Sequence, residues 1–312
     1  MELVPTRDGY GKGLLTLGKT NPRVVALCAD LDESTRSQWF AEKYPERFIQ
    51  MGIGEQNMVL VAAGLANYGK IPFIASYATF SPGRNNEQIR TTVSLSELPV
   101  KIAGAHAGVS VGPDGATHQA LEDIALMRVQ PNMVVICPCD AVEIEKATVA
   151  AAAVHGPVYL RFGRAASPVM TTRKTPFKIG CAEIFWTGKD ITIIACGQLV
   201  YQALLAARAL AKDNITAEVI NCHTIKPLDE KTIIASVKKT RAVVTVEEHQ
   251  IAGGLGSAVA ETLVQRLPVP MEFVGVRDRF GESGEPDELL QKFGLTSPYI
   301  VTAVRKVLKR KK

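Results

Sequence analysis

The sequence predicts an α/β protein with parallel β-sheets, arranged in two domains. Short apolar runs rich in β-branched residues alternate along the chain with amphipathic stretches of helical length. A chain of 312 residues with 46% hydrophobic content can bury two cores of ordinary size. This alternation is typical of βα units around a parallel sheet, and sites in such folds lie at the carboxyl ends of the strands.

The first half of the chain carries five runs that we expect to form strands. An amphipathic segment at residues 141–154, between the last two runs, predicts a helix. The predicted strands cover residues 24–28, 71–75, 100–103, 133–137 and 158–161.

A polar stretch with two prolines interrupts this rhythm at residues 167–178. Composition of this kind is common at domain boundaries. We therefore expect one domain at residues 1–170, a linker at 171–177 and a smaller α/β domain at 178–312. In the smaller domain, strands are predicted at residues 191–195, 217–221 and 242–246, and helices at 200–212 and after the glycine-rich turn 252–256.

Composition argues against a membrane or secreted protein. No run approaches the roughly 18 apolar residues of a membrane span, and the beginning of the sequence lacks the layout of a signal peptide. The six cysteines are scattered, and none forms a C-x-x-C pair. We therefore expect a cytoplasmic protein whose cysteines are mostly buried free thiols.

The net charge of +5 does not indicate binding to nucleic acid. Six basic residues lie among the last eight positions, and no aromatic residue that could stack on a base interleaves with them. The rest of the chain is close to neutral. We interpret the basic end as a solvated helix end.

Glu55 places a carboxylate at the start of an apolar strand–turn–helix segment. Gly52 and Gly54 allow a tight turn before it, and the residues that follow are mostly small and apolar. The helix dipole stabilises a carboxylate in the first turn. On this segment alone, a purely structural role for Glu55 is the simpler interpretation.

Two more clusters follow predicted strands. Phe80 comes after strand 71–75, where its ring could stack on a flat heteroaromatic group. His106 and His118 lie in a glycine-rich loop after strand 100–103 and could donate to sugar oxygens or carry protons near neutral pH. A zinc site is the alternative, but partners at ligand spacing are missing.

These clusters together resemble the transketolase family of thiamine-diphosphate enzymes. The shared motifs are Gly-x-Gly-Glu, Thr-Phe 25 positions after that Glu, and a His loop with Asp-Gly-x-Thr-His-Gln. The resemblance implies that Glu55 hydrogen-bonds the aminopyrimidine ring of the cofactor and that Phe80 stacks on it. It also implies that His106 and His118 contact the reacting oxygens of the donor sugar, and that Asp114 binds a sugar hydroxyl.

The same resemblance implies a site for phosphorylated sugars. Arg7, Ser34 and Arg161 match the family's phosphate-binding positions, where charge-assisted hydrogen bonds are strong. Arg164 is an alternative to Arg161 through a small shift in alignment. The second domain resembles the family's C-terminal domain, to which we assign no catalytic residue.

One part of the family's site is missing from the sequence. The Gly-Asp-Gly segment and the later Asn that hold the diphosphate and its metal have no counterpart, because the Gly-x-Asp-Gly at residues 112–115 belongs to the His loop. The resemblance therefore implies the C-terminal subunit of a split transketolase. An N-terminal subunit would supply the ligands for the diphosphate and for Mg²⁺ or Ca²⁺, in a heterotetramer with two copies of each chain.

The implied reaction moves a two-carbon ketol unit from a ketose phosphate, such as xylulose 5-phosphate, to an aldose phosphate. Three alternatives stay open. They are half of a 1-deoxy-D-xylulose-5-phosphate synthase, the β-type subunit of a 2-oxoacid dehydrogenase, and a non-catalytic assembly or regulatory relative. His106 and the arginines argue against the dehydrogenase. The retention of Glu55, Phe80 and both histidines argues against the non-catalytic relative.

Overall fold

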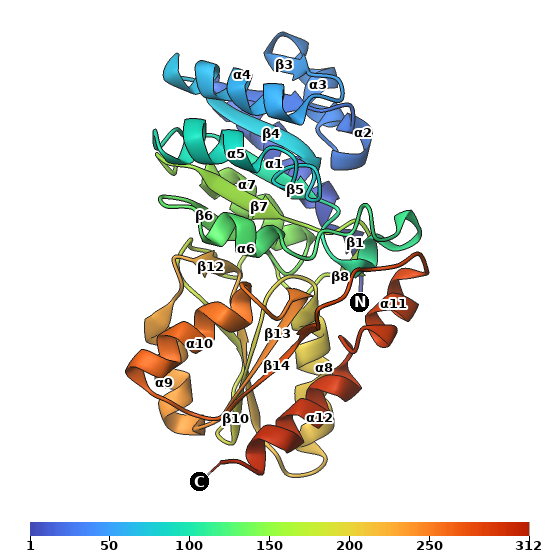
Figure 1. The fold of residues 1–312 in the computed structure, drawn as a ribbon, viewed down its shortest axis with the longest axis vertical. Coiled ribbons are helices and arrows are strands. Elements are labelled where there is room, and N and C mark those ends of the chain that lie inside the picture. The colour runs from blue at the N-terminus through green and yellow to red at the C-terminus, as the bar shows by residue number, and fades with distance from the viewer. Residues whose placement is uncertain (312) are drawn as a thin grey trace.

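The computed structural model describes residues 1–311, which form two open sheets of mainly parallel strands with helices packed on both faces (Figure 1). The first sheet has seven strands in the order β12-β6-β7-β5-β4-β2-β3, and the second has five in the order β14-β13-β10-β11-β9. The predicted fold class is therefore confirmed. Lys312, the last residue of the basic end, lies outside the described residues.

The strands of the first sheet are mostly continuous apolar runs, because helices cover both faces of a parallel sheet. β2 and β4, for example, are buried at every position. The strands are β2 (Val24–Cys28), β3 (Phe48–Gln50), β4 (Ile71–Tyr77), β5 (Lys101–Ala105), β6 (Val134–Ile136), β7 (Val158–Arg161) and β12 (Thr224–Lys226).

Helices α1 (Thr6–Thr20) and α7 (Ala141–Ala151) pack closely on one face of this sheet. Gly9 of α1 makes this possible, since a Cβ there would lie 2.0 Å from the carbonyl oxygen of Ala141. The remaining helical segments of this unit are α2 (Asp32–Thr35), α3 (Gln38–Lys43), η1 (Pro45–Arg47), α4 (Glu55–Asn67), α5 (Asn86–Gln88), η2 (Ile89–Ser94), η3 (Val109–Asp114) and α6 (Asp123–Arg128).

The second unit repeats the pattern on a smaller scale. Its strands are β9 (Glu183–Trp186), β10 (Ile191–Ala195), β11 (Ala217–Asn221), β13 (Val243–Gln250) and β14 (Met271–Val276), and only β9 runs antiparallel to its neighbour. Its helices are α8 (Leu199–Ala211), α9 (Glu230–Thr240), α10 (Leu255–Arg266), α11 (Pro286–Lys292) and α12 (Ser297–Leu308).

The two units share structure. One cluster of buried apolar side chains includes Met58 of α4 and Val259 of α10, so a single core runs from one sheet to the other. β12 follows β11 in the chain but pairs antiparallel with β6 at the edge of the first sheet. A short antiparallel ribbon of β1 (Leu3–Pro5) and β8 (Ala166–Pro168) ties the beginning of the chain to the end of the first unit.

Several predicted elements lie where expected, whereas the 15-residue helix α1 and the short strands β3 and β12 were not predicted. Strands predicted at 158–161, 191–195 and 217–221 lie where expected. β3 and β12 have three residues each, too few to show a period in the sequence. β13 extends four residues beyond the prediction, through three buried polar residues.

All six cysteines are free, and five of them are buried. Within residues 1–311, no helix combines the length and the apolar character needed to cross a membrane.

Candidate functional site

Most of the predicted site residues gather at the carboxyl edge of the first sheet. Phe80 follows β4, His106 follows β5, and Ser34 lies in α2 just after β2. Glu55 begins α4, after β3. Because the carboxyl ends of parallel strands meet at one edge, residues far apart in the sequence come together here.

Glu55 is buried, with 2% of its surface exposed, although it begins a helix. Its Oε2 accepts a hydrogen bond from Arg84 Nη1 at 2.7 Å, and Ser76 Oγ lies 3.4 Å from Oε1. The Nδ2 of Asn85 donates to its backbone carbonyl. The side chain is thus fixed in direction, and Oε1 keeps capacity to accept a stronger hydrogen bond.

Phe80 is half-buried and lies beside Glu55. The Cζ of Arg84, which pairs with Glu55, is 4.6 Å from the centroid of the Phe80 ring. The Phe80 ring also stacks with Tyr77 at a centroid distance of 6.0 Å and meets His118 edge-on at 5.3 Å. A buried carboxylate and an aromatic ring therefore contact the same arginine.

Tyr77, which the sequence analysis did not single out, connects the two halves of the site. Its ring centroid lies 4.1 Å from that of His106 and 5.9 Å from that of His118. Its hydroxyl is 3.2 Å from the Oγ of Ser34. The available signal was its position as the last residue of a buried strand, three residues before Phe80.

His106 has a strained backbone and an unsatisfied side chain. Its φ is +52°, in the left-handed region that non-glycine residues rarely occupy, and it is 1% exposed. Neither ring nitrogen makes a hydrogen bond of ordinary geometry, and the backbone of Ser34 is a polar group that acts on the ring. Burial, together with the nearby positive charges of Arg7 and Arg164, lowers the pKa of His106 to about 3. The imidazole is therefore neutral at physiological pH and offers one donor and one acceptor.

Positive charge surrounds His106. Arg7, in the first turn of α1, donates to the carbonyl of Ser34 at 3.2 Å. Burial, followed by the charge of Arg36, lowers the pKa of Arg7. Arg36 is itself held by Asp8, with Nε 2.7 Å from Oδ1. A cluster of cations in a partly buried position favours an anionic ligand.

Arg164 lies on the other side of the His loop. Its Nη1 donates to the carbonyl of Val111 at 3.0 Å and to Oδ1 of Asp114 at 3.1 Å. Both side chains are partly exposed, at 38% for Arg164 and 28% for Asp114. His118 is also partly exposed, and its Nδ1 lies 2.9 Å from the hydroxyl of Thr117.

Arg161 lies elsewhere, and the structure argues against the phosphate-binding role predicted for it. Its side chain is only 5% exposed, with Nε 2.8 Å from Oδ2 of Asp123 and Nη2 2.7 Å from the carbonyl of Glu248. The hydroxyl of Tyr159 donates to the same carboxylate at 2.7 Å. A buried carboxylate needs a cation, and Arg161 serves Asp123 in this way. Arg164, in contrast, is partly exposed and pairs with Asp114 of the His loop.

Metal ligands are not gathered at this edge. Across residues 1–311, no three His, Cys, Asp or Glu side chains are arranged as ligands for a metal ion. What the edge offers instead is a buried acceptor at Glu55, a flat ring at Phe80, and a neutral imidazole among arginines.

Two family models match the chain. The pyrimidine-binding domain of transketolase matches residues 2–169, and the C-terminal domain of transketolase matches residues 180–300. The family depends on thiamine diphosphate.

Relatives of two lengths match. A 6-deoxy-6-sulfo-D-fructose transketolase subunit from Clostridium sp. (strain MSTE9) is 43% identical over 305 residues, which cover 98% of this chain and 95% of that protein. Human transketolase is 38% identical over 306 residues, which cover 97% of this chain but 49% of the human protein.

The fold also matches a solved structure. A split-gene transketolase described as an inactive β4 tetramer superposes with a TM-score of 0.93 at 47% identity, covering 99% of this chain and 100% of that one. The carboxyl-edge geometry, the domain matches and these relatives agree, and the chain therefore belongs to the transketolase family, of which it carries the pyrimidine-binding and C-terminal domains.

Proposed function

We propose that this chain is the C-terminal subunit of a split transketolase and that it transfers a two-carbon ketol unit from a ketose phosphate to an aldose phosphate. The observation that carries the proposal is His106, a buried neutral imidazole whose ring nitrogens make no hydrogen bond of ordinary geometry. The ring lies among arginines and packs on the Tyr77 ring. Such a group is suited to a sugar oxygen next to a phosphate.

The cofactor-binding residues fit the aminopyrimidine end of thiamine diphosphate. Glu55 would hold a proton at a ring nitrogen through Oε1, and Phe80 would stack on the ring plane. Arg84 pairs with Glu55 and lies over Phe80, so it keeps both groups in place. When bound, thiamine diphosphate supplies the nucleophilic carbon for cleavage of a carbon–carbon bond.

The substrate-binding residues fit a phosphorylated ketose. His106 and His118 would donate hydrogen bonds to the oxygens at the reacting carbons, and Asp114 would accept from a sugar hydroxyl. Arg7, Ser34 and Arg164 would bind the phosphate. Arg164 takes the place of Arg161 in this proposal because its guanidinium is partly exposed and that of Arg161 is enclosed.

A second polypeptide completes the proposed site. The sequence lacks the segments that hold the diphosphate and its Mg²⁺ or Ca²⁺, so an N-terminal subunit would provide them, in a heterotetramer with two copies of each chain. Exposed apolar side chains beside Glu55 support this, since Ile53 is 78% exposed and Leu60 of α4 is 47% exposed. Human transketolase, which this chain covers by about half, has the length for both parts.

The anionic group of the donor sugar could be a phosphate or a sulfonate. One relative is named for a 6-deoxy-6-sulfo sugar, whose sulfonate also presents three oxygens to arginines. We favour a phosphorylated donor because Arg7 lies near His106 and Arg36 and Arg164, each paired with one carboxylate, add to the positive field there. Xylulose 5-phosphate is the donor to try first.

The test is an assay of this chain together with its purified N-terminal subunit, thiamine diphosphate and Mg²⁺. We expect ketol transfer from xylulose 5-phosphate to ribose 5-phosphate by the pair and none by either chain alone. Parallel reactions with 6-deoxy-6-sulfofructose, with pyruvate plus glyceraldehyde 3-phosphate and with branched 2-oxoacids separate the alternatives. A pair that forms but transfers nothing would indicate the non-catalytic relative.

Binding by the isolated chain gives a second test. Without the diphosphate ligands, it should show no tight calorimetric binding of thiamine diphosphate. Strong binding by this chain alone would contradict the two-subunit proposal.

A further inference from the structure

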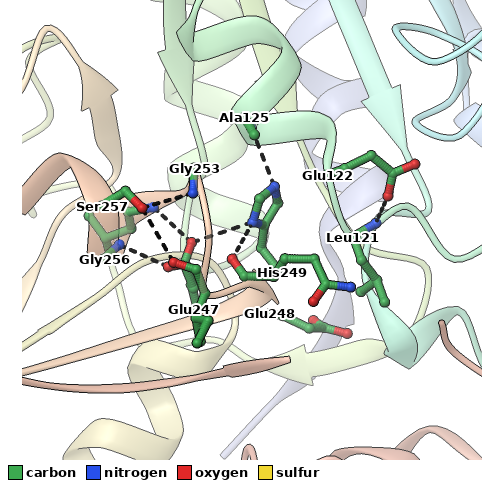
Figure 2. A network of polar contacts seen from close by, with 12 residues as sticks. Leu121, Glu122, Ala125, Glu247, Glu248, His249, Gly253, Gly256 and Ser257 are labelled. Atoms are coloured by element: carbon green, nitrogen blue, oxygen red, sulfur yellow. Dashed lines mark hydrogen bonds and ion pairs between the residues drawn. The ribbon is translucent and has the colours of Figure 1, made fainter. Parts of the chain in front are cut away.

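Three consecutive polar residues of β13 are buried where the two units meet. Glu247, Glu248 and His249 are exposed by 1%, 4% and 0% (Figure 2). Neighbouring residues of a strand point to opposite faces, so the two carboxylates reach different parts of the protein. Their contacts show two different roles.

Glu247 acts within its own unit. Its carboxylate accepts from the backbone amides of Leu255 at 2.7 Å and Gly256 at 2.8 Å, which are the first two residues of α10. Gly254 allows the approach, because a Cβ there would lie 2.0 Å from Oε2 of Glu247. Glu247 is therefore a cap for a helix of the second unit.

Glu248 reaches into the first unit. Its Oε1 accepts from the backbone amide of Ser110 at 2.6 Å, and its Oε2 accepts from Nε2 of Gln198 at 2.6 Å. The same Gln198 nitrogen lies 2.6 Å from the hydroxyl of Ser110. Two side chains of the second unit, one from β13 and one from the residue just before α8, thus hold one residue of the His loop.

The His loop is shaped to receive this carboxylate. Gly108 has a φ of +92°, and a Cβ there would lie 2.3 Å from both Cδ and Oε1 of Glu248. Gly108 and Ser110 lie two and four residues after His106. The contact is therefore made at the first turn of the loop that joins His106 to Asp114 and His118.

The backbone conformation of His106 depends on contacts that other segments make with the His loop. Its left-handed backbone is strained, and its ring nitrogens make no hydrogen bond of ordinary geometry that would hold it. Backbone hydrogen bonds fix Ala107 to Phe162 and Gly108 to Ala120 on one side of the turn. Glu248 supplies the corresponding hydrogen bond on the other side.

We infer that Glu248 is a positioning residue for the reaction, through which the second unit holds the His loop in the geometry that binds the donor sugar. Its role in the reaction rests on the function proposed above, whereas its effect on the loop does not. Removal of the carboxylate should loosen residues 107–112 and displace His106 and Asp114. Glu55 and Phe80 lie on other segments and should keep their places.

Glu248→Ala and Glu247→Ala are the matched pair for the test, because they remove buried carboxylates from adjacent positions. In the full chain, hydrogen exchange should quicken on the order of tenfold or more in residues 107–112 for Glu248→Ala. For Glu247→Ala, it should quicken at the beginning of α10 instead. Unchanged protection of residues 107–112 in Glu248→Ala would overturn the inference.

Kinetics of the assembled enzyme give the second measurement. Glu248→Ala should lower kcat/KM for the ketose phosphate on the order of tenfold or more, with the Kd for thiamine diphosphate unchanged. Glu247→Ala should leave both near wild type. Equal losses of kcat/KM in the two variants would mean that Glu248 contributes only stability. The two measurements can also disagree. If Glu248→Ala alters hydrogen exchange in residues 107–112 but the assembled wild-type enzyme transfers no ketol unit, the proposed function is rejected and the effect of Glu248 on the loop stands.

A rescue experiment covers the case in which Glu248→Ala does not fold. Glu248→Gln keeps an acceptor for the Ser110 amide but turns an amide nitrogen toward the amide nitrogen of Gln198. Adding Gln198→Glu restores an acceptor opposite that donor, so the double variant should regain loop protection and most of kcat/KM. No recovery in the double variant would contradict the inference.

Discussion

The two sheets of this protein use the same edge for different purposes. At the carboxyl edge of the first sheet, Phe80, Arg84 and Arg164 are partly or largely exposed, and neither ring nitrogen of His106 makes a hydrogen bond of ordinary geometry. At the carboxyl edge of the second sheet, the polar groups are enclosed against the first unit. Gly197 donates to the carbonyl of Cys137 at 3.0 Å.

Other contacts of the second edge follow the same pattern. Asn221 donates to Oε1 of Glu143 at 2.7 Å, and the carbonyl of His223 accepts from the amide of Cys137. The polar groups of the second edge are thus used up in contacts with the first unit, whereas part of the first edge stays exposed.

The largest expected effect is on stability, at an enclosed residue. Arg161→Ala leaves the Asp123 carboxylate buried without its cation, which should lower the free energy of unfolding by about 3–5 kcal/mol. Urea unfolding of the full chain measures this. Arg164→Ala is the control, since its partly exposed pair with Asp114 should contribute less than about 1 kcal/mol. If both variants lose the same free energy of unfolding, Arg161 is not the more enclosed and more stabilising of the two arginines.

The second effect is on turnover, at the open edge. Glu55→Gln keeps the shape of the side chain and removes the carboxyl group that we propose hydrogen-bonds the cofactor. The kcat of the assembled enzyme should fall on the order of a hundredfold or more. Glu87→Gln, which changes an exposed carboxylate in α5, should leave kcat unchanged. Near-normal turnover by Glu55→Gln would exclude the proposed role.

The third effect separates recognition of the anion from cofactor chemistry. Arg164→Ala should lower kcat/KM for phosphorylated donors by about 10- to 150-fold, mainly through KM, because a remote charge-assisted contact contributes mostly uniform binding. Unphosphorylated donors never make the contact and should lose far less. If both donor types lose equally, Arg164 is structural.

The smallest effect is a pH dependence of stability. The pKa of His106 is about 3 in the folded chain and near 6.5 when solvated, so unfolding takes up a proton below pH 6.5. Above pH 6.5, the titration of His106 does not lower the free energy of unfolding. Below pH 6.5, the free energy of unfolding decreases by up to about 1.4 kcal/mol per pH unit as pH falls toward 3.

Urea titrations at pH 7 and pH 5 measure this difference. His106→Asn should reduce the loss of stability between the two pH values, whereas His155→Gln, at an exposed position, should not. An unchanged pH dependence in His106→Asn would show that the buried imidazole is not the group responsible.

Much of the site could be predicted because its residues lie in short, continuous motifs. Glu55 follows a glycine turn, Phe80 follows a strand, and the His loop carries its Asp and second His within thirteen residues. Local order in the chain is enough to place each of these at a strand end. Tyr77 was missed because a strand's last aromatic residue looks like a core residue until its neighbours are known.

The choice between Arg161 and Arg164 could not be made from the chain alone. Arg161 ends the strand and Arg164 follows it three positions later, and either satisfies the motif. The decision depends on Asp123, a buried carboxylate 38 residues earlier in the sequence that pairs with Arg161. The cost of burying that charge, rather than any local pattern, directs Arg161 inward and leaves Arg164 at the edge.

The sequence by itself determined the fold class, the two α/β units and the motifs that carry the chemistry, because periodicity and turn residues act over a few positions. Only the tertiary structure decided which polar residues are enclosed by the other unit and which stay at an exposed edge. Glu247 and Glu248 are adjacent in the sequence and equally buried, yet one caps a helix and the other holds the His loop. That difference arises because a strand directs neighbouring side chains to opposite faces, and packing determines what each face meets.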